Sequence, residues 1–272
     1  ADQGKEMTIW WLAYPLLGVF AGFVAGLFGV GGGLTIVPLL LMLFQAQDFP
    51  AQHAMHLALG TSMATIVLTS ISSMRAHHGH GAVRWDIVKS FAPGLMAGTF
   101  GGTFIAAAIP TRPLAVVFTA IVFYASATML LDRKPKPSRQ LPGALGMASV
   151  GTGIGVVSSL VAAGGGFLSI PFMVFCNVVI HQAVGTSAAL GFPIAVAGAI
   201  GYVVSGLKAS GLPAYSFGYI YLPALVGVVA VSMLVAPLGA RFAHSLPVKP
   251  LKRGFGVFLA LLALQMTWRL LH

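Results

Sequence analysis

Two glycine-rich stretches decide the architecture of this chain: Gly29-Val30-Gly31-Gly32-Gly33-Leu34-Thr35-Ile36-Val37-Pro38 and Ala163-Gly164-Gly165-Gly166-Phe167-Leu168-Ser169-Ile170-Pro171. Each places three consecutive glycines before a short apolar run that contains a proline, and the two patterns are offset by 133 residues. As a helix, the first apolar run (34–44) is about 16 Å long, near half of a ~30 Å bilayer core. We therefore expect a helix break followed by a short helix in each half of the chain.

The composition predicts an all-α polytopic membrane protein. Of 272 residues, 57% are hydrophobic and 7% are charged, whereas a soluble domain carries about 25% charged residues. The first apolar segment has twenty residues and exceeds the ~7–15 residue core of a signal peptide, so we expect it to be a membrane segment. The expected segments are 9–28, 34–44, 55–74, 87–109, 114–131, 143–161, 167–179, 183–206, 219–240 and 254–271.

Further matches between the two halves indicate an internal repeat. Besides the glycine-rich stretches, they are Gly22 with Gly155, Gly60-Thr61-Ser62 with Gly185-Thr186-Ser187, and Ile109-Pro110-Thr111-Arg112-Pro113-Leu114 with Leu246-Pro247-Val248-Lys249-Pro250-Leu251. The predicted parts are an N-terminal repeat (1–131), a basic linker (132–142) and a C-terminal repeat (143–272).

The distribution of charge predicts the orientation of the halves. Placing the basic linker in the cytoplasm puts 11 of the 15 Lys and Arg residues inside, as the positive-inside rule requires. Both chain ends are then external, and the two halves enter the membrane from opposite sides. Such inverted-topology repeats are typical of secondary transporters. This placement explains the formal charge of +10 without a nucleic-acid partner.

The glycine breaks are the first candidate binding site. A helix that begins at membrane depth directs the positive end of its dipole at the gap, which favours an anion. Hydroxyl groups near the start of the third segment of each half could donate hydrogen bonds to the same anion. The alternatives are that the glycines only allow close helix packing and that the hydroxyls bond to their own or neighbouring helices. The candidate binding residues are Gly31, Gly32, Gly33, Thr61, Ser62, Gly164, Gly165, Gly166, Thr186 and Ser187.

The acidic residues argue against a cation as substrate. All five (Asp2, Glu6, Asp48, Asp86 and Asp132) lie in predicted termini, loops or segment ends, whereas cation-coupled carriers usually hold carboxylates inside the bundle. The tract His77-His78-Gly79-His80 resembles a metal-binding run, but we interpret it as a solvated loop. We expect no metal and no cofactor.

The duplicated glycine-rich motif and the Gly-Thr-Ser segments resemble those of the sulfite exporter TauE/SafE family, also called the toluene sulfonate uptake permeases. The resemblance covers nearly the whole chain. It implies a bacterial or archaeal inner-membrane carrier of sulfite, sulfoacetate or related sulfonates. It also implies that the substrate binds at the candidate residues named above.

We therefore predict a transporter of sulfur-containing anions that works by alternating access, with a small anion and the lipid bilayer as its partners. A passive anion channel is the alternative that the sequence leaves open. A membrane enzyme is a weaker alternative, because the sequence has no paired carboxylates, no Gly-x-Ser-x-Gly motif and no spaced His/Asp cage. We accordingly do not expect an enzyme.

Overall fold

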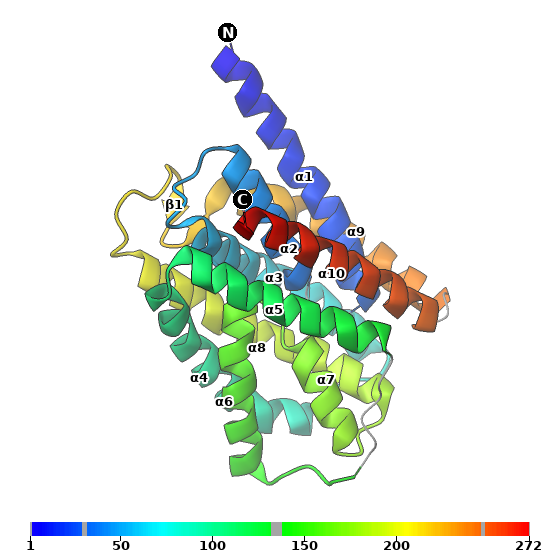
Figure 1. Ribbon diagram of the computed structural model, residues 1–272. Coiled ribbons are helices and arrows are strands. Elements are labelled where there is room, and N and C mark those ends of the chain that lie inside the picture. Colours follow the sequence, from blue (N-terminus) through cyan, green and yellow to red (C-terminus); the bar gives the residue numbers. More distant parts are fainter. Residues whose placement is uncertain (1, 29–31, 132–137, 246–247, 272) are drawn as a thin grey trace.

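The structure is a computed structural model that describes residues 2–28, 32–131, 138–245 and 248–271. Within these ranges the chain forms ten helices and one β-hairpin (Figure 1). The first half contains α1 (Asp2–Phe28), α2 (Gly33–Ala46), α3 (Ala54–Gly79), α4 (Trp85–Ala108) and α5 (Thr111–Leu130). The second half contains α6 (Ala144–Val161), α7 (Gly166–Phe175), α8 (Ile180–Gly206), β1 (Ser216–Phe217), β2 (Ile220–Tyr221), α9 (Leu222–Ser245) and α10 (Val248–Leu271).

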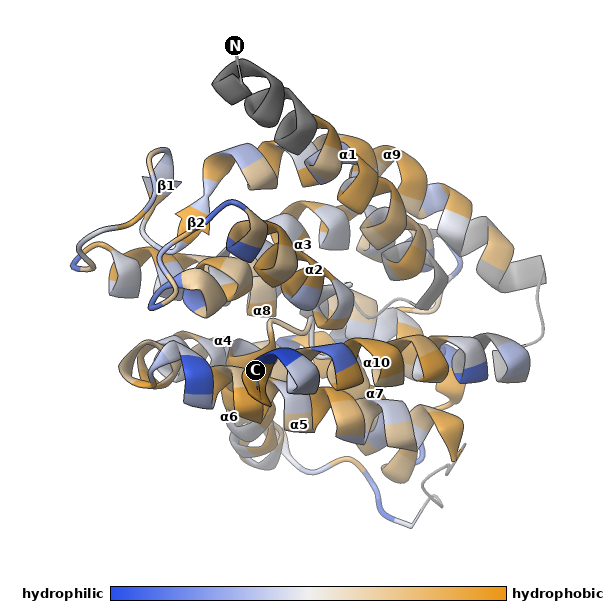
Figure 2. Cartoon of the chain, turned by 45° about the horizontal axis from the view of Figure 1, so that its top comes forward, coloured by the Kyte–Doolittle hydropathy of each residue, from blue (hydrophilic) through white to orange (hydrophobic). Residues whose placement is uncertain are grey.

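The predicted fold class is confirmed, because each expected segment corresponds to one of these helices. Seven of the described helices are long and apolar enough to cross a membrane. The colours of Figure 2 show apolar residues along most helices, and large apolar side chains such as Leu145, Leu234 and Leu261 are exposed. Helices α2 and α7 are about 21 Å and 15 Å long, too short to cross a ~30 Å core.

Several helix ends differ from the predicted ones, and three of these differences matter for the site or have a visible backbone cause. Helix α3 continues to Gly79, so His77 and His78 lie in its last turn and not in a loop. Helix α9 begins at Leu222, because the chain before it turns at Gly218 (φ 56°) and forms the hairpin. Helix α7 ends at Phe175, before Asn177 takes a left-handed φ of 63°. Residues 132–137 of the predicted basic linker lie outside the described ranges.

The helices of one half pack mainly against those of the other. Helix α1 packs on α9, and α6 packs on α4; α3 packs on α8, and α5 on α10. The short helices α2 and α7 pack on α3 and α8 respectively. Figure 1 shows α5 and α10 side by side in front of α3 and α8. Replacing each helix by the one five places further along reproduces these pairings, as expected of a duplicated chain. The inverted orientation of the halves across the membrane stays a prediction.

Glycines allow the closest of these helix contacts. A Cβ atom at Gly22 of α1 would collide with the backbone of Ser232 on α9. A Cβ atom at Gly155 of α6 would collide with the backbone of Leu95 on α4. Gly22 and Gly155 are matched positions of the predicted repeat, so both serve helix packing, as small residues commonly do in membranes.

Candidate functional site

Both glycine-rich breaks adopt the same backbone conformation. Gly32 precedes α2 with φ 71°, and Gly165 precedes α7 with φ 79°. Residues that carry a Cβ atom rarely adopt this left-handed backbone conformation, so a glycine is favoured at each position. The carbonyl of Gly32 accepts bonds from the N–H groups of Thr35 and Ile36, and that of Gly165 from those of Leu168 and Ser169. The predicted break and short helix are therefore present in both halves, although Gly31 lies outside the described residues.

The two breaks meet inside the protein. Gly33, the first residue of α2, lies against the backbone carbonyl of Ala162, which ends α6 just before Gly164. A Cβ atom at Gly33 would overlap the oxygen of that carbonyl. Gly33 and Ala162 are both buried. The structure thus brings together two segments that are far apart in the sequence, at the start of one short helix and just ahead of the other.

The Gly-Thr pairs of α3 and α8 hold matching loops in the opposite half. The hydroxyl oxygen of Thr61 accepts a bond of 2.9 Å from the N–H of Tyr221, which precedes α9. The hydroxyl oxygen of Thr186 accepts a bond of 3.0 Å from the N–H of Arg84, which precedes α4. Each threonine thus caps a donor next to the start of a helix. The described contacts give both a packing role, and their contact with substrate stays a prediction.

The glycines of these pairs make the same kind of approach. Gly60 lies against the carbonyl of Tyr219, and Gly185 lies against that of Ala82. Tyr219 and Ala82 each lie two residues before the residue whose N–H donates to the neighbouring threonine. A larger residue at either glycine would push the loop away from its threonine.

The serines that follow have different surroundings in the two halves. The hydroxyl of Ser187 is 2.9 Å from that of Ser169 in the first turns of α7. The hydroxyl of Ser62 is buried, with no hydrogen-bond partner among the described residues. In the repeat register, Ile36 stands where the second half has Ser169, so the first half lacks the corresponding hydroxyl.

Ser187 and Gly164 border a small cavity of about 60 Å³, here called the Ser187 cavity. A single water molecule needs roughly 10–15 Å³ measured in this way, so the cavity has room for a group of several atoms. It extends along the second half of α3, towards His77. The lining residues are Gly26, Thr69, Ser70, Ser72, Ser73, Ala76, His77, Gly164, Ser187, Ala188, Gly191, Ala236 and Pro237.

The lining of the Ser187 cavity combines small apolar residues with the hydroxyl groups of α3 and α8 and the side chain of His77. It contains no carboxylate. Ser70 and Thr69 now donate to carbonyls of their own helix, but a hydroxyl can rotate towards a ligand. The N-terminal end of α7 lies beside Gly164 and contributes a positive partial charge. These groups can bind a small anion by hydrogen bonds without a buried lysine or arginine.

The hydroxyl cluster of α3 is absent from the predicted binding residues. Thr69, Ser70, Ser72 and Ser73 stand close together in an otherwise apolar segment, and this run of hydroxyls was the available signal. The sequence does not say which of them face a cavity, since that depends on how α3 packs. No group of three side chains able to hold a metal occurs among the described residues.

Comparisons with known proteins agree with this architecture. A probable membrane transporter protein of Haemophilus influenzae is 39% identical over 252 residues, covering 92% of this chain and 96% of the relative. A probable membrane transporter protein of Bacillus subtilis is 28% identical, covering 87% and 90% of the two chains. One of Methanocaldococcus jannaschii is 24% identical, covering 89% and 90%. No solved structure matches this chain.

All three relatives are named probable membrane transporter proteins, and the match covers at least 90% of each. The apolar helices described above fit that description. The family described as "Sulfite exporter TauE/SafE" matches residues 14–266. The chain therefore belongs to the sulfite exporter TauE/SafE family of membrane transporters.

Proposed function

We propose that this transporter moves a sulfur-containing anion, such as sulfite, sulfoacetate or another organosulfonate, and binds it in the Ser187 cavity. The observation that carries the proposal is the lining of that cavity, in which Gly164 next to α7 and hydroxyls of α3 and α8 face one space without a carboxylate. The description of the family suggests the sulfur chemistry.

Hydrogen bonding explains why such a site suits an oxyanion. The first N–H groups of a helix have no partner within the helix and point along its axis. Gly164, two residues before α7, borders the cavity together with the hydroxyls of Ser187 and Ser70, so donors from three segments lie close to one ligand site. A cation would meet the wrong end of the helix dipole and would find no carboxylate in the lining.

Alternating access would use both halves of the chain. We propose that the halves form an inverted repeat and that the Ser187 cavity belongs to one of two states. In the opposite state the start of α2 and the hydroxyl of Ser62 would hold the anion in the same manner. The buried hydroxyl of Ser62, which has no hydrogen-bond partner among the described residues, supports this proposal, because buried polar groups are usually hydrogen-bonded. The location that goes with the proposal is the inner membrane, with both chain ends external and the basic linker cytoplasmic.

The test combines binding and transport. The unfolding temperature of the purified protein is measured with sulfite, sulfoacetate, taurine, sulfate, phosphate and chloride. A ligand at 100 times its Kd should stabilise the protein by about 2.7 kcal/mol, and we expect a sulfur anion to give the largest shift. Counterflow of that anion in proteoliposomes separates a carrier from a channel, since only a carrier accumulates labelled substrate transiently against its gradient while unlabelled substrate flows the other way.

One substitution can fill the cavity without disturbing the backbone. A Cβ atom at Gly191 would lie 3.4 Å from the Gly164 carbonyl oxygen and 3.7 Å from Ser70 Cβ. We expect Gly191→Leu to abolish the anion-induced shift and the transport. Gly153→Leu is the matched control, because a Cβ atom there has no neighbour within 4 Å. Unchanged transport by folded Gly191→Leu protein would place the substrate elsewhere.

A further inference from the structure

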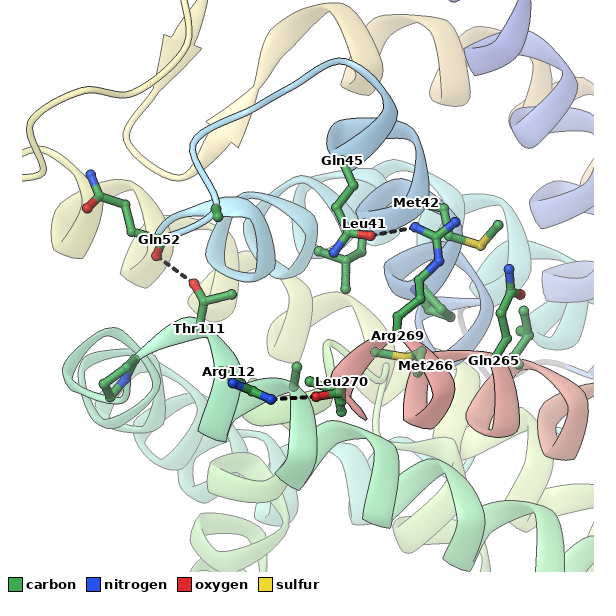
Figure 3. A pocket seen from close by; sticks show the side chains of 15 residues that line it. Leu41, Met42, Gln45, Gln52, Thr111, Arg112, Gln265, Met266, Arg269 and Leu270 are labelled. Carbon is green, nitrogen blue, oxygen red and sulfur yellow. Dashed lines mark hydrogen bonds between the residues drawn. The ribbon is translucent and has the colours of Figure 1, made fainter. Parts of the chain in front are cut away.

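A second cavity lies at the other end of α3 and is larger, about 490 Å³. Helices α2, α5 and α10 surround it, and we call it the Arg112 cavity (Figure 3). Its floor is apolar and mostly buried, and is formed by Pro38, Leu41, Ala115, Leu262 and Met266. Its rim carries Arg112, Arg269, Gln45, Gln52 and Gln265.

The two arginines give this cavity a positive rim. Arg112 donates to the carbonyl oxygen of Leu270 at 2.7 Å, and Arg269 donates to Oε1 of Gln45 at 2.6 Å. Figure 3 shows the two guanidinium groups on different sides of the cavity. A guanidinium has five N–H donors, so each keeps donors for a ligand. Among the described residues neither arginine is paired with a carboxylate, and the lining contains none.

The cavity lies where a membrane surface is expected. Arg112 is the second residue of α5 and Arg269 is in the last turn of α10, and the ends of spanning helices lie at the headgroup level. Beside the lining positions, the same helices expose Val116 (52%), Leu264 (56%) and Leu271 (73%). Trp268 is 64% exposed, and tryptophan is enriched at this depth. A positive rim, an apolar floor and a lipid-facing border thus occur together.

We propose that the Arg112 cavity binds an anionic phospholipid, with the phosphate between Arg112 and Arg269 and part of an acyl chain on the apolar floor. Arginine suits this role because its planar donors match the oxygens of a phosphate. The glutamines on the rim can hydrogen-bond a headgroup without adding charge. This site is separate from the Ser187 cavity and does not depend on the proposed substrate.

The experiment uses the full-length protein in a nonionic detergent. Two samples are compared, one with phosphatidylglycerol and one with phosphatidylcholine of identical acyl chains. In each, the unfolding temperature is measured and the bound lipids are counted by native mass spectrometry. We expect the wild type to retain phosphatidylglycerol preferentially and to be stabilised more by it. In Arg112→Gln/Arg269→Gln, retention of phosphatidylglycerol should fall about 10-fold, to the level of phosphatidylcholine.

Control variants separate the cavity from general surface charge. Arg112→Lys/Arg269→Lys keeps both charges and should keep most of the preference. Lys208→Gln removes an exposed charge outside the cavity and should behave like the wild type. If the double glutamine variant does not fold, Arg112→Gln alone should give an intermediate loss.

Three results would overturn the proposal. The first is equal retention of the two lipids by the wild type. The second is a preference for phosphatidylglycerol that survives loss of both arginines. The third is a shift by soluble glycerol phosphate as large as that by phosphatidylglycerol, since the cavity would then bind oxyanions from water and the acyl chain would play no part.

Discussion

The break before α2 and the break before α7 begin alike, with Gly32 and Gly165 in the same left-handed conformation. Their surroundings differ. The start of α2 is closed by direct contact between Gly33 and the Ala162 carbonyl, whereas Gly164 before α7 borders the Ser187 cavity. Among the described residues, the first break therefore makes a tight contact, and the second borders a cavity that carries several hydroxyl groups.

The difference continues into the helices that follow the breaks. Ser187 on α8 meets Ser169 on α7, while Ser62 on α3 has no described partner. A perfectly symmetric pair of halves would show two equal cavities. A carrier resting in one of two states, as proposed, would show an open copy and a closed copy, and the described residues show a cavity at Gly164 and a closed contact at Gly33.

The closed contact can be broken by one methyl group. We expect Gly33→Ala to lower the free energy of unfolding by about 3 kcal/mol, since its Cβ atom would overlap a backbone carbonyl that cannot move aside as a side chain could. Denaturation of the purified protein in detergent measures this. Gly153→Ala, with open space at its Cβ, should leave stability unchanged or raise it by up to about 1 kcal/mol. Wild-type stability of Gly33→Ala would mean that the two breaks do not meet.

Binding of the anion in the Ser187 cavity can be tested by substitution of Ser187. We expect Ser187→Ala to weaken binding of the transported anion about 10-fold, because a hydrogen bond to a charged group contributes about 1.5 kcal/mol. The measurement is the anion concentration needed for half of the maximal shift in unfolding temperature. Ser149→Ala is the control, since the hydroxyl of this exposed serine donates to the carbonyl of Leu145 in its own helix. Wild-type affinity of Ser187→Ala would remove this serine from the site.

The sequence predicts the helices and both breaks because hydropathy and glycine runs are local signals. The sequence does not predict the hydrogen bonds of Thr61 and Thr186, since their partners lie 160 and 102 residues away along the chain. The hydroxyl run from Thr69 to Ser73, in contrast, is visible in the sequence. Its exposure to a cavity depends on the packing of α3 against α8 and α9. Of the predicted binding residues, Gly164 and Ser187 line the cavity, and long-range packing decides which other side chains join them.

Thr61 and Thr186 make matching hydrogen bonds, so their substitution should have equal effects on stability in the two halves. We expect Thr61→Val and Thr186→Val each to lower the free energy of unfolding by about 0.6 kcal/mol, the average for a hydrogen bond within a membrane protein. Each substitution removes the acceptor of one loop N–H while keeping the shape of the side chain. Denaturation of the two variants side by side measures the difference. A loss in one half alone would contradict the equivalence of these contacts.

Substitution of Ser62 has the smallest expected effect on stability. It distinguishes a closed copy that opens in an opposite state from two halves that are permanently unequal. Because its buried hydroxyl has no described partner, Ser62→Ala should leave the free energy of unfolding unchanged or raise it by up to about 1 kcal/mol. If the closed copy opens in the opposite state, the same variant should transport more slowly. Its affinity in the anion-induced thermal shift should stay at the wild-type value if the anion binds in the Ser187 cavity, as proposed. Transport at the wild-type rate would instead make Ser62 a packing residue and leave the two halves permanently unequal.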